Sequence, residues 1–457
     1  MLFHIIHKEK KTLKNYNRRE FIKIISGAIG GAMLTGCGSG GSAPSAYRSY
    51  RITNQGDVVG TPGNNMVIDS FRGTVHISSD GIITFDAVDA DKRSGIFQLG
   101  VDLNGRLPAV AWERTALIKG ETLSDGRVVA GFKAMDVNRA GSIAVDILPT
   151  TLSGQRVNHI GSGLYLDVAQ QGFEPVMLYN RQLLDGAIYT TGVLGDIDLH
   201  EGNEMLVVGS YNAVDAEMLP GHGLFYLPGA SVSAASMLMS SGDFVPSVNY
   251  SLGHLGLVDL HDNGHYVFQG NARPLVNSQA NGTGTDTAGS MLMVTGNVAT
   301  YETHLLGAAP ELGAGDVIGE TIYGPRMTAS GIPYSVTWDA ADEKMVLYHG
   351  DQVVIATGDT SPAGGSVSLL STGSVGPGDE IYYTITSIYP SAQDLVVYDG
   401  GDHSTLLSRG DVLSDGGAPV EVIYFGATTK HVDDQNRIVL FCSFTDGSSA
   451  LVVGLPV

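Results

Sequence analysis

The sequence predicts an all-β fold, and three observations support this prediction. Residues 47–457 are rich in Gly and Val, and their apolar and aromatic residues recur at strand-like spacing. This region has no long segment with apolar residues at the helical period of 3.6. Three short signals also recur in the same order along it, which indicates an internal repeat. Short strands joined by Gly, Asp and Asn turns explain all three observations.

The first signal is a Gly-Asp step. Gly120–Gly126 (GETLSDG) reappears at Gly410–Gly416 (GDVLSDG), 290 residues later, which is five times 58. The step is also found at Gly56-Asp57, Gly242-Asp243, Gly315-Asp316 and Gly358-Asp359. In the unit near residue 180 only the later half remains, as Leu183–Gly186.

The second signal is a polar turn that follows each step and opens an apolar strand. Its seven copies are Asp80-Gly81, Asn138–Gly141, Glu201–Asn203, Asp262–Gly264, Ser330-Gly331, Gly378-Asp379 and Asp433–Asn436. The third signal is a short apolar strand after a variable loop. Its copies are Ile96-Phe97, Leu164–Leu166, Leu224–Tyr226, Met291–Met293, Met345–Leu347, Leu395–Val397 and Leu451–Val453.

Together the signals divide the 411 residues 47–457 into seven units of about 59 residues, each with room for four short strands. One such sheet cannot bury both faces, so the units are predicted to pack as the blades of a closed β-propeller. The order of signals predicts that Leu451–Val453 pairs with Tyr50–Thr53, so that both termini complete one blade. Two stacked β-sandwiches and a ring of six or eight blades are the alternatives.

The N-terminal region is predicted to be an export signal, residues 1–36, and not part of the fold. A basic cluster precedes the apolar run Ile24–Leu34, which is too short for a membrane span. Arg18-Arg19-Glu20-Phe21-Ile22-Lys23 resembles the twin-arginine translocation signal. The resemblance implies export in a folded state, with recognition through Arg18, Arg19, Phe21 and Lys23.

The end of this signal carries a second motif, Leu34-Thr35-Gly36-Cys37, which resembles the bacterial lipoprotein box. The resemblance implies lipid attachment to Cys37 and a membrane anchor, with 37–46 as a Gly/Ser tether before the repeat domain 47–457. Gly38 follows the Cys, and this resembles the sequence of lipoproteins that are sorted by default to the outer membrane. We therefore expect the chain on the periplasmic face of the outer membrane of a bacterial envelope.

The net charge of the chain limits the kinds of partner that we expect. Residues 1–36 hold seven of the 26 basic and two of the 47 acidic side chains, so the remainder has a formal charge of −26. Such a charge repels nucleic acid, which we exclude as a partner, and anionic lipid headgroups. Solubility on an exported surface explains the charge, and cationic ligands or divalent cations are the alternative. We expect a monomer.

Cys442 is the only cysteine besides Cys37, so no disulfide is expected within the mature chain. Because it stands in the apolar run Phe441–Phe444, we expect it to be buried as a small hydrophobic side chain.

The repeat also carries a family resemblance. Asn138-x-x-Gly141-x-x-Ala144-Val145 resembles the Asn-x-x-Gly-x-x-Ala-Phe motif of exported bacterial tandem-repeat proteins with varied surface anchors. That group implies repeats and anchorage but no particular chemistry.

Four features of the sequence are candidates for a functional site. His254, His261 and His265 have zinc-ligand character, but the last two flank a repeat turn. Asp86, Asp89 and Asp91 lack the order of a calcium loop, and Asn281–Asp286 has no basic residue for phosphate. Paired carboxylates for glycoside chemistry have no sequence spacing in a propeller, because they come from different blades. We therefore assign no catalytic, cofactor or metal residues.

The sequence thus predicts a lipid-anchored envelope protein that binds or scaffolds a protein or glycan. The alternative is an envelope polysaccharide hydrolase or lyase that uses carboxylates on the axial face of the propeller. A cofactor-bearing redox protein is a third hypothesis, because twin-arginine export often serves such enzymes, although no haem, flavin or cluster motif is present.

Overall fold

A computed structural model describes residues 47–456, apart from short gaps. The gaps are 105–106, 151–162, 169, 180–186, 189–194, 214–220, 244–249, 262, 275–290, 301–302, 309–315, 318–320, 340–341, 389–391, 414–418 and 427–429. Ser45–Val457 form one compact unit. The export signal, lipoprotein box and tether precede the described residues, so they stay predictions.

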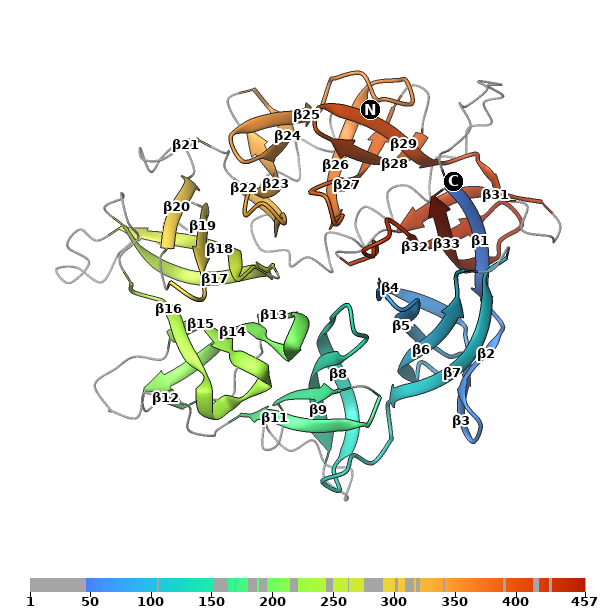
Figure 1. Cartoon of the computed structure of the whole chain (residues 1–457), viewed down its shortest axis with the longest axis horizontal. Helices are drawn as coiled ribbons and strands as arrows, with labels where there is room; N and C mark the ends of the chain where they lie inside the picture. The colour runs from blue at the N-terminus through green and yellow to red at the C-terminus, as the bar shows by residue number, and fades with distance from the viewer. Residues whose placement is uncertain are drawn as a thin grey trace. The chain divides into compact units, whose positions relative to one another are not determined.

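The strands form seven mostly antiparallel sheets around a common centre, which is a seven-bladed β-propeller (Figure 1). The all-β and seven-blade predictions are confirmed. Blades 1 to 3 comprise β4 (Ser70–Ile77), β5 (Ile82–Val88), β6 (Ser94–Asp102) and β7 (Ala109–Ile118); β8 (Val128–Val137), β9 (Ile143–Thr150), β10 (Gly163–Asp167) and β11 (Phe173–Leu178); and β12 (Ala187–Ile188), β13 (Asp196–Leu199), β14 (Met205–Ala213), β15 (Gly221–Leu227) and β16 (Ser236–Ser240).

Blades 4 to 6 follow in chain order. They comprise β17 (Tyr250–Leu260), β18 (His265–Pro274), β19 (Met291–Asn297), β20 (Thr303–Ala308) and β21 (Asp316–Val317); β22 (Thr321–Met327), β23 (Pro333–Asp339), β24 (Lys344–His349) and β25 (Gln352–Ala356); and β26 (Val367–Val375), β27 (Ile381–Ser387), β28 (Ala392–Asp399) and β29 (Asp402–Ser408). The hairpin of β2 (Val58–Thr61) and β3 (Asn64–Val67) lies outside the blades, and η3 (Glu201–Asn203), η4 (Pro228–Ala230) and η5 (Val232–Ala234) are single 3-10 turns.

Blade 7 is built from both ends of the chain, in the order β1 (Tyr47–Asn54), β33 (Ser449–Pro456), β32 (Ile438–Phe444), β31 (Val420–Gly426) and β30 (Val412–Leu413). Tyr50 pairs with Val453 and Arg51 with Val452, and after a bulge Thr53 pairs with Leu451. The predicted ring closure is therefore confirmed, with the predicted strands.

Four of the Gly-Asp steps end the last strand of a blade, whereas Asp316 lies in β21. Gly56, Gly242, Gly358 and Gly410 have φ between 92° and 99°, a left-handed conformation that favours glycine. The acidic residue then accepts a hydrogen bond from a backbone N–H three residues earlier. In the last of these steps Asp411 Oδ2 accepts from the Ser408 N–H at 2.8 Å. The first signal of the repeat is therefore a strand-end cap and needs no catalytic explanation.

Apolar side chains fill the seams between blades. Six buried clusters of described residues each join two neighbouring blades, covering seams 7/1, 1/2, 2/3, 3/4, 5/6 and 6/7. At seam 7/1, Phe441 and Val453 belong to the same cluster as Phe85. Cys442 is buried in the cluster of seam 6/7, as the sequence predicts. Among the described residues, no helix is long and apolar enough to cross a membrane.

Candidate functional site at the centre of the ring

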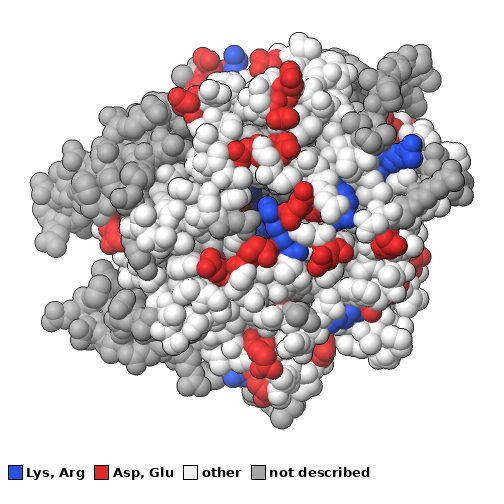
Figure 2. Space-filling model, viewed as in Figure 1, with Lys and Arg blue, Asp and Glu red and all other residues white. Residues whose placement is uncertain are grey.

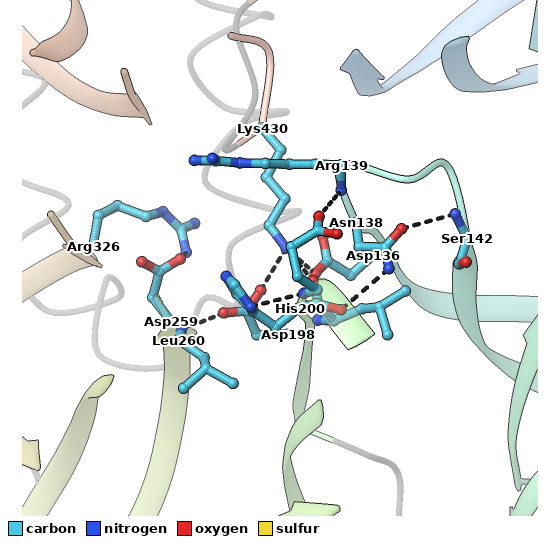
Figure 3. A network of polar contacts seen from close by, with 12 residues as sticks. Asp136, Asn138, Arg139, Ser142, Asp198, His200, Asp259, Leu260, Arg326 and Lys430 are labelled. Carbon is cyan, nitrogen blue, oxygen red and sulfur yellow. Dashed lines mark hydrogen bonds and ion pairs between the residues drawn. The ribbon is translucent and has the colours of Figure 1, made fainter. Parts of the chain in front are cut away.

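One position of the repeat places polar side chains at the centre of the propeller. It is the penultimate residue of the strand that leads into the polar turn in blades 1 to 6, namely β4, β8, β13, β17, β22 and β26. In blade order these residues are His76, Asp136, Asp198, Asp259, Arg326 and Ser374. Blade 7 contributes Lys430, which follows β31. We call Asp136, Asp198, Asp259, Arg326 and Lys430 the central charge cluster; Figure 3 shows them converging from different blades.

The three carboxylates each bind the next blade. Asp136 Oδ2 accepts the Leu199 N–H at 2.6 Å, and Asp259 Oδ2 accepts the Met327 N–H at 2.7 Å. Asp198 Oδ2 accepts the Leu260 N–H in the same way. Charge-assisted bonds of this kind are about twice as strong as neutral ones. The carboxylates therefore connect blades 2, 3, 4 and 5 in sequence.

Lys430 crosses the ring to reach two of these carboxylates (Figure 3). Its Nζ lies 2.6 Å from Asp136 Oδ2, 2.7 Å from Asp198 Oδ1 and 2.7 Å from the Leu199 carbonyl oxygen. Since blades 7 and 3 are not neighbours, this ammonium group ties opposite parts of the ring together. The third carboxylate has a different cation: Arg326 Nη1 of blade 5 lies 3.0 Å from Asp259 Oδ1 of blade 4.

Burial controls the protonation of the cluster. Loss of water around the carboxyls raises the pKa of Asp198 and of Asp259 to about 6, although Lys430 and Arg326 respectively oppose the shift. Burial alone would lower the pKa of Lys430, but Asp136 and Asp198 raise it above its usual value. Three carboxylates face two permanent cations, so the ionised cluster carries one net negative charge.

A second ionic link lies among the turns that join first and second strands. Arg139 Nη1 is 2.6 Å from Asp434 Oδ1, and the Arg139 N–H donates to Glu201 Oε1 at 2.8 Å. Ser79 Oγ donates to Asp434 Oδ2 at 2.5 Å. On the face seen in Figure 2, Lys and Arg side chains gather at the centre with Asp and Glu around them. The turns of blades 1, 2, 3 and 7 are thus connected.

The histidines considered as zinc ligands do not meet as a set of three: the His261 N–H donates to the His265 carbonyl across the turn at 2.8 Å, but the His254 ring contacts a different histidine. His254 lies beside His222, with ring centroids 4.4 Å apart, and His261 lies 6.3 Å from His200. The part of the chain that the structure describes contains no group of three His, Cys, Asp or Glu side chains able to hold a metal ion.

Two of the three aspartates considered as a calcium loop, Asp86 and Asp89, accept hydrogen bonds from nearby backbone N–H groups. Asp86 Oδ1 accepts the Thr74 N–H at 3.1 Å. Asp89 accepts the Arg93 N–H at 2.8 Å and pairs with its guanidinium at 3.1 Å. Asn281–Asp286, the segment weighed for phosphate, lies outside the described residues.

Sequence reasoning missed the central charge cluster, although a signal for most of it exists. His76, Asp136, Asp259 and Arg326 each stand five residues before a turn glycine with positive φ. Aligning the units on the left-handed turn residue would have found a column of polar side chains, four of which are the charged residues Asp136, Asp198, Asp259 and Arg326. Lys430 breaks the column, because in blade 7 the residue five before the left-handed Asn436 is His431.

No family model matches the chain, and no curated protein matches it. Among solved structures it is similar to an oligogalacturonate lyase in complex with manganese, with 9% identity over 90% of this chain and 98% of that one and a TM-score of 0.44. A puromycin-hydrolyzing peptidase of Mycobacterium tuberculosis has 10% identity over 84% of this chain and a TM-score of 0.41. The WD40 domain of Toxoplasma gondii coronin has 9% identity over 90% of this chain and 87% of that one, with a TM-score of 0.38.

The chain spans about half the length of the peptidase chain, of which 51% is covered. At such low identity the similarity concerns the fold alone, and none of these activities is transferred to this chain.

Proposed function

We propose that this chain is a lipid-anchored envelope protein that binds a protein or a glycan and performs no catalysis. The twin-arginine signal would export it in the folded state, and the lipid on Cys37 would hold it at the periplasmic face of the outer membrane. The binding face would be the one formed by the turns between first and second strands, where segments from every blade converge on a rigid scaffold.

The observation that carries the proposal is how the central carboxylates are used. Asp136, Asp198 and Asp259 each accept a backbone N–H of the next blade and each contact a cation. A general acid or base must exchange its proton with a substrate within hydrogen-bond reach. Side chains that hold the ring together in this way are poorly suited to that role, which favours binding over catalysis.

Delivery is tested with two variants in a bacterial host that has both export systems. We expect Cys37→Ala to be released from the membrane fraction, because it cannot accept the lipid. We expect Arg18→Lys with Arg19→Lys to accumulate unprocessed in the cytoplasm. Membrane retention of Cys37→Ala would overturn the anchor, and normal export of the double variant would overturn the twin-arginine route.

Binding is tested with the purified Cys37→Ala protein on a glycan array, and with cross-linking from the turn face in intact cells. A reproducible ligand whose binding is reduced by changes on the turn face is the expected result. Failure of both assays to identify any ligand would contradict the proposal.

A polysaccharide hydrolase or lyase is the second candidate, and one observation favours it. Asp198 and Asp259 have pKa values raised to about 6, in the range that suits a general acid. A screen of envelope polysaccharides with purified protein decides between the candidates. Turnover that is lost in Asp198→Asn, while that variant still unfolds cooperatively, would replace the binding proposal with catalysis.

A further inference from the structure

Arg326 is a buried guanidinium whose hydrogen-bonding capacity is mostly unused. Its side chain is 6% exposed, and among the described residues its hydrogen bond is the one from Nη1 to Asp259 at 3.0 Å. Its Nε is buried and has no partner among the described protein atoms. A guanidinium has five N–H donors, and buried donors are normally satisfied. The Nε–Nη2 edge of Arg326 therefore lacks the hydrogen-bond acceptor that a buried guanidinium normally has, among the residues described.

Arg437 provides an internal comparison. It is also a buried arginine paired with an aspartate, but its Nε donates to Asp433 Oδ2 at 2.5 Å and its Nη2 donates to the Ser79 carbonyl at 2.7 Å. The Nε–Nη2 edge is filled by the protein in Arg437. The free edge of Arg326 is therefore not a general feature of buried arginines in this chain.

His76 is a second buried group without partners, on the same repeat position as Arg326. It is 3% exposed, and neither ring nitrogen has a hydrogen-bond partner among the described residues. Burial, followed by the positive charges of Lys430 and Arg326, lowers its pKa to about 3. His76 is therefore neutral at pH 7, with one N–H to donate. The N–H of its neighbour Ile77 donates to the Lys430 carbonyl at 3.2 Å, which places this part of β4 beside Lys430.

We propose that the centre of the ring is a binding site for a small carboxylate, held by the Nε–Nη2 edge of Arg326 with His76 as a further donor. That edge matches the two oxygens of a carboxylate in a bidentate fork. The site is independent of the anchor and of any macromolecular partner on the turn face.

Charge balance adds a pH dependence. The groups acting on Arg326 and its surroundings are Asp136, Asp196, Asp198, Asp259, Tyr334, Lys430 and His76. The ionised cluster already carries one net negative charge, so an added anion favours protonation of Asp198 or Asp259, whose pKa values are about 6. Carboxylate binding should therefore be accompanied by proton uptake and be tighter at pH 6 than at pH 8.

The test is an NMR titration of the folded Cys37→Ala protein with acetate, and with acetamide as a neutral probe of the same shape. We expect acetate to shift the His76 ring resonances saturably, and acetamide to leave them unchanged. Arg326→Lys keeps a cation for Asp259 but loses the fork, so it should weaken acetate binding by about tenfold or more. Arg437→Lys should bind acetate like the parent protein.

His76→Phe gives a second test that leaves the Arg326–Asp259 pair untouched. Because His76 has no hydrogen bond to lose among the described residues, this variant should fold and yet bind acetate more weakly, as followed on the acetate resonance. The proposal is overturned if acetate does not saturate, if acetamide produces the same shifts, or if folded Arg326→Lys binds acetate as tightly as the parent.

Discussion

The two halves of the central ring join their blades by different means. In blades 2 to 4 the penultimate residue is an aspartate that captures a backbone N–H of the following blade. In blades 5, 6 and 1 the corresponding residues are Arg326, Ser374 and His76, and blade 7 contributes Lys430, one residue before the aligned position. Of these four residues, Ser374 is the one whose side chain accepts a backbone N–H of the next blade among the described residues, from His431 at 2.8 Å.

This difference shows how one position of a repeat can serve two purposes. The acidic half forms the links between blades but concentrates three carboxylates in a dry region. The other half supplies the two cations that offset the repulsion and desolvation of these carboxylates. One of them, Lys430, extends across the ring to Asp136 and Asp198. Blade 7, which closes the ring, also provides the charge that neutralises blades 2 and 3.

The largest expected effect comes from Lys430→Met, which removes the cation shared by the acidic half. Asp136 and Asp198 would then be buried without a counter-ion, and breaking a buried ion pair costs about 3–5 kcal/mol. We expect the free energy of unfolding, measured in urea, to fall by that amount. The control is Lys92→Met. The side chains of Lys92 and its partner Asp69 are 75% and 39% exposed, so their ion pair should contribute less than about 0.5 kcal/mol. Equal losses in the two variants would refute the bridging role.

Replacing one member of each half compares the two kinds of link directly. Asp198→Asn weakens both the bond to the Leu260 N–H and the contact with Lys430, so it should cost about 2–3 kcal/mol. Ser374→Ala removes a neutral acceptor from the His431 N–H, and should cost about 1 kcal/mol. Urea unfolding of both variants at pH 7 measures the difference. A larger loss for Ser374→Ala would reverse the comparison.

Asp146, a carboxylate in blade 2, tests whether its hydrogen bond or its burial has the larger effect on its pKa. It is fully buried, its Oδ1 accepts the Tyr179 hydroxyl at 2.8 Å, and its Oδ2 has no partner among the described residues. Burial raises its pKa to about 7 against the effects of Tyr179 and Lys133. The folded state then holds the proton more tightly than the unfolded state, so stability from this group decreases as pH rises from about 4 to about 7.

The matching variant is Asp146→Asn, which cannot lose a proton. At pH 8 it should be more stable than the parent protein by on the order of 2 kcal/mol, and at pH 4 the advantage should disappear. Thermal unfolding across this pH range measures the effect. A constant difference between the two proteins at every pH would show that Asp146 does not titrate in this range.

The smallest effect is expected at the turns above the cluster. Arg139 and Asp434 are 38% and 39% exposed, so water and salt screen their contact. Arg139→Ala should lower the free energy of unfolding by about 0.5 kcal/mol or less. The loss should shrink further in high salt, whereas the loss in Lys430→Met should change little. If Arg139→Ala lowers the free energy of unfolding more than Ser374→Ala does, contacts among the exposed turns stabilise the ring more than this buried hydrogen bond does.

The repeat was readable from the sequence because each of its signals has a local physical cause. A glycine with positive φ and an acidic strand-end cap must recur wherever the same turn recurs, as at Asp57 and Asp411. The closing pair of strands was also predictable, since a ring leaves its two end strands without partners. Residues 120–126 and 410–416 were therefore enough to suggest the period.

The central site was not predictable to the same degree. Asp136 and Asp198 are 62 residues apart in the chain, and Lys430 lies 294 and 232 residues from them. No local pattern links residues so distant, and nothing in the sequence around Lys430 indicates that its side chain crosses the ring. The free edge of Arg326, compared with the filled edge of Arg437, is visible only once their neighbours are known.

The sequence by itself determined the all-β class, the seven units, the turns and the strand that closes the ring, because these depend on backbone conformation and on alternation of apolar residues. The tertiary structure alone decided which charged residues meet and which buried donors lack a partner. Those properties arise from side chains of different blades, and only the closure of the ring brings them within a few ångströms of one another.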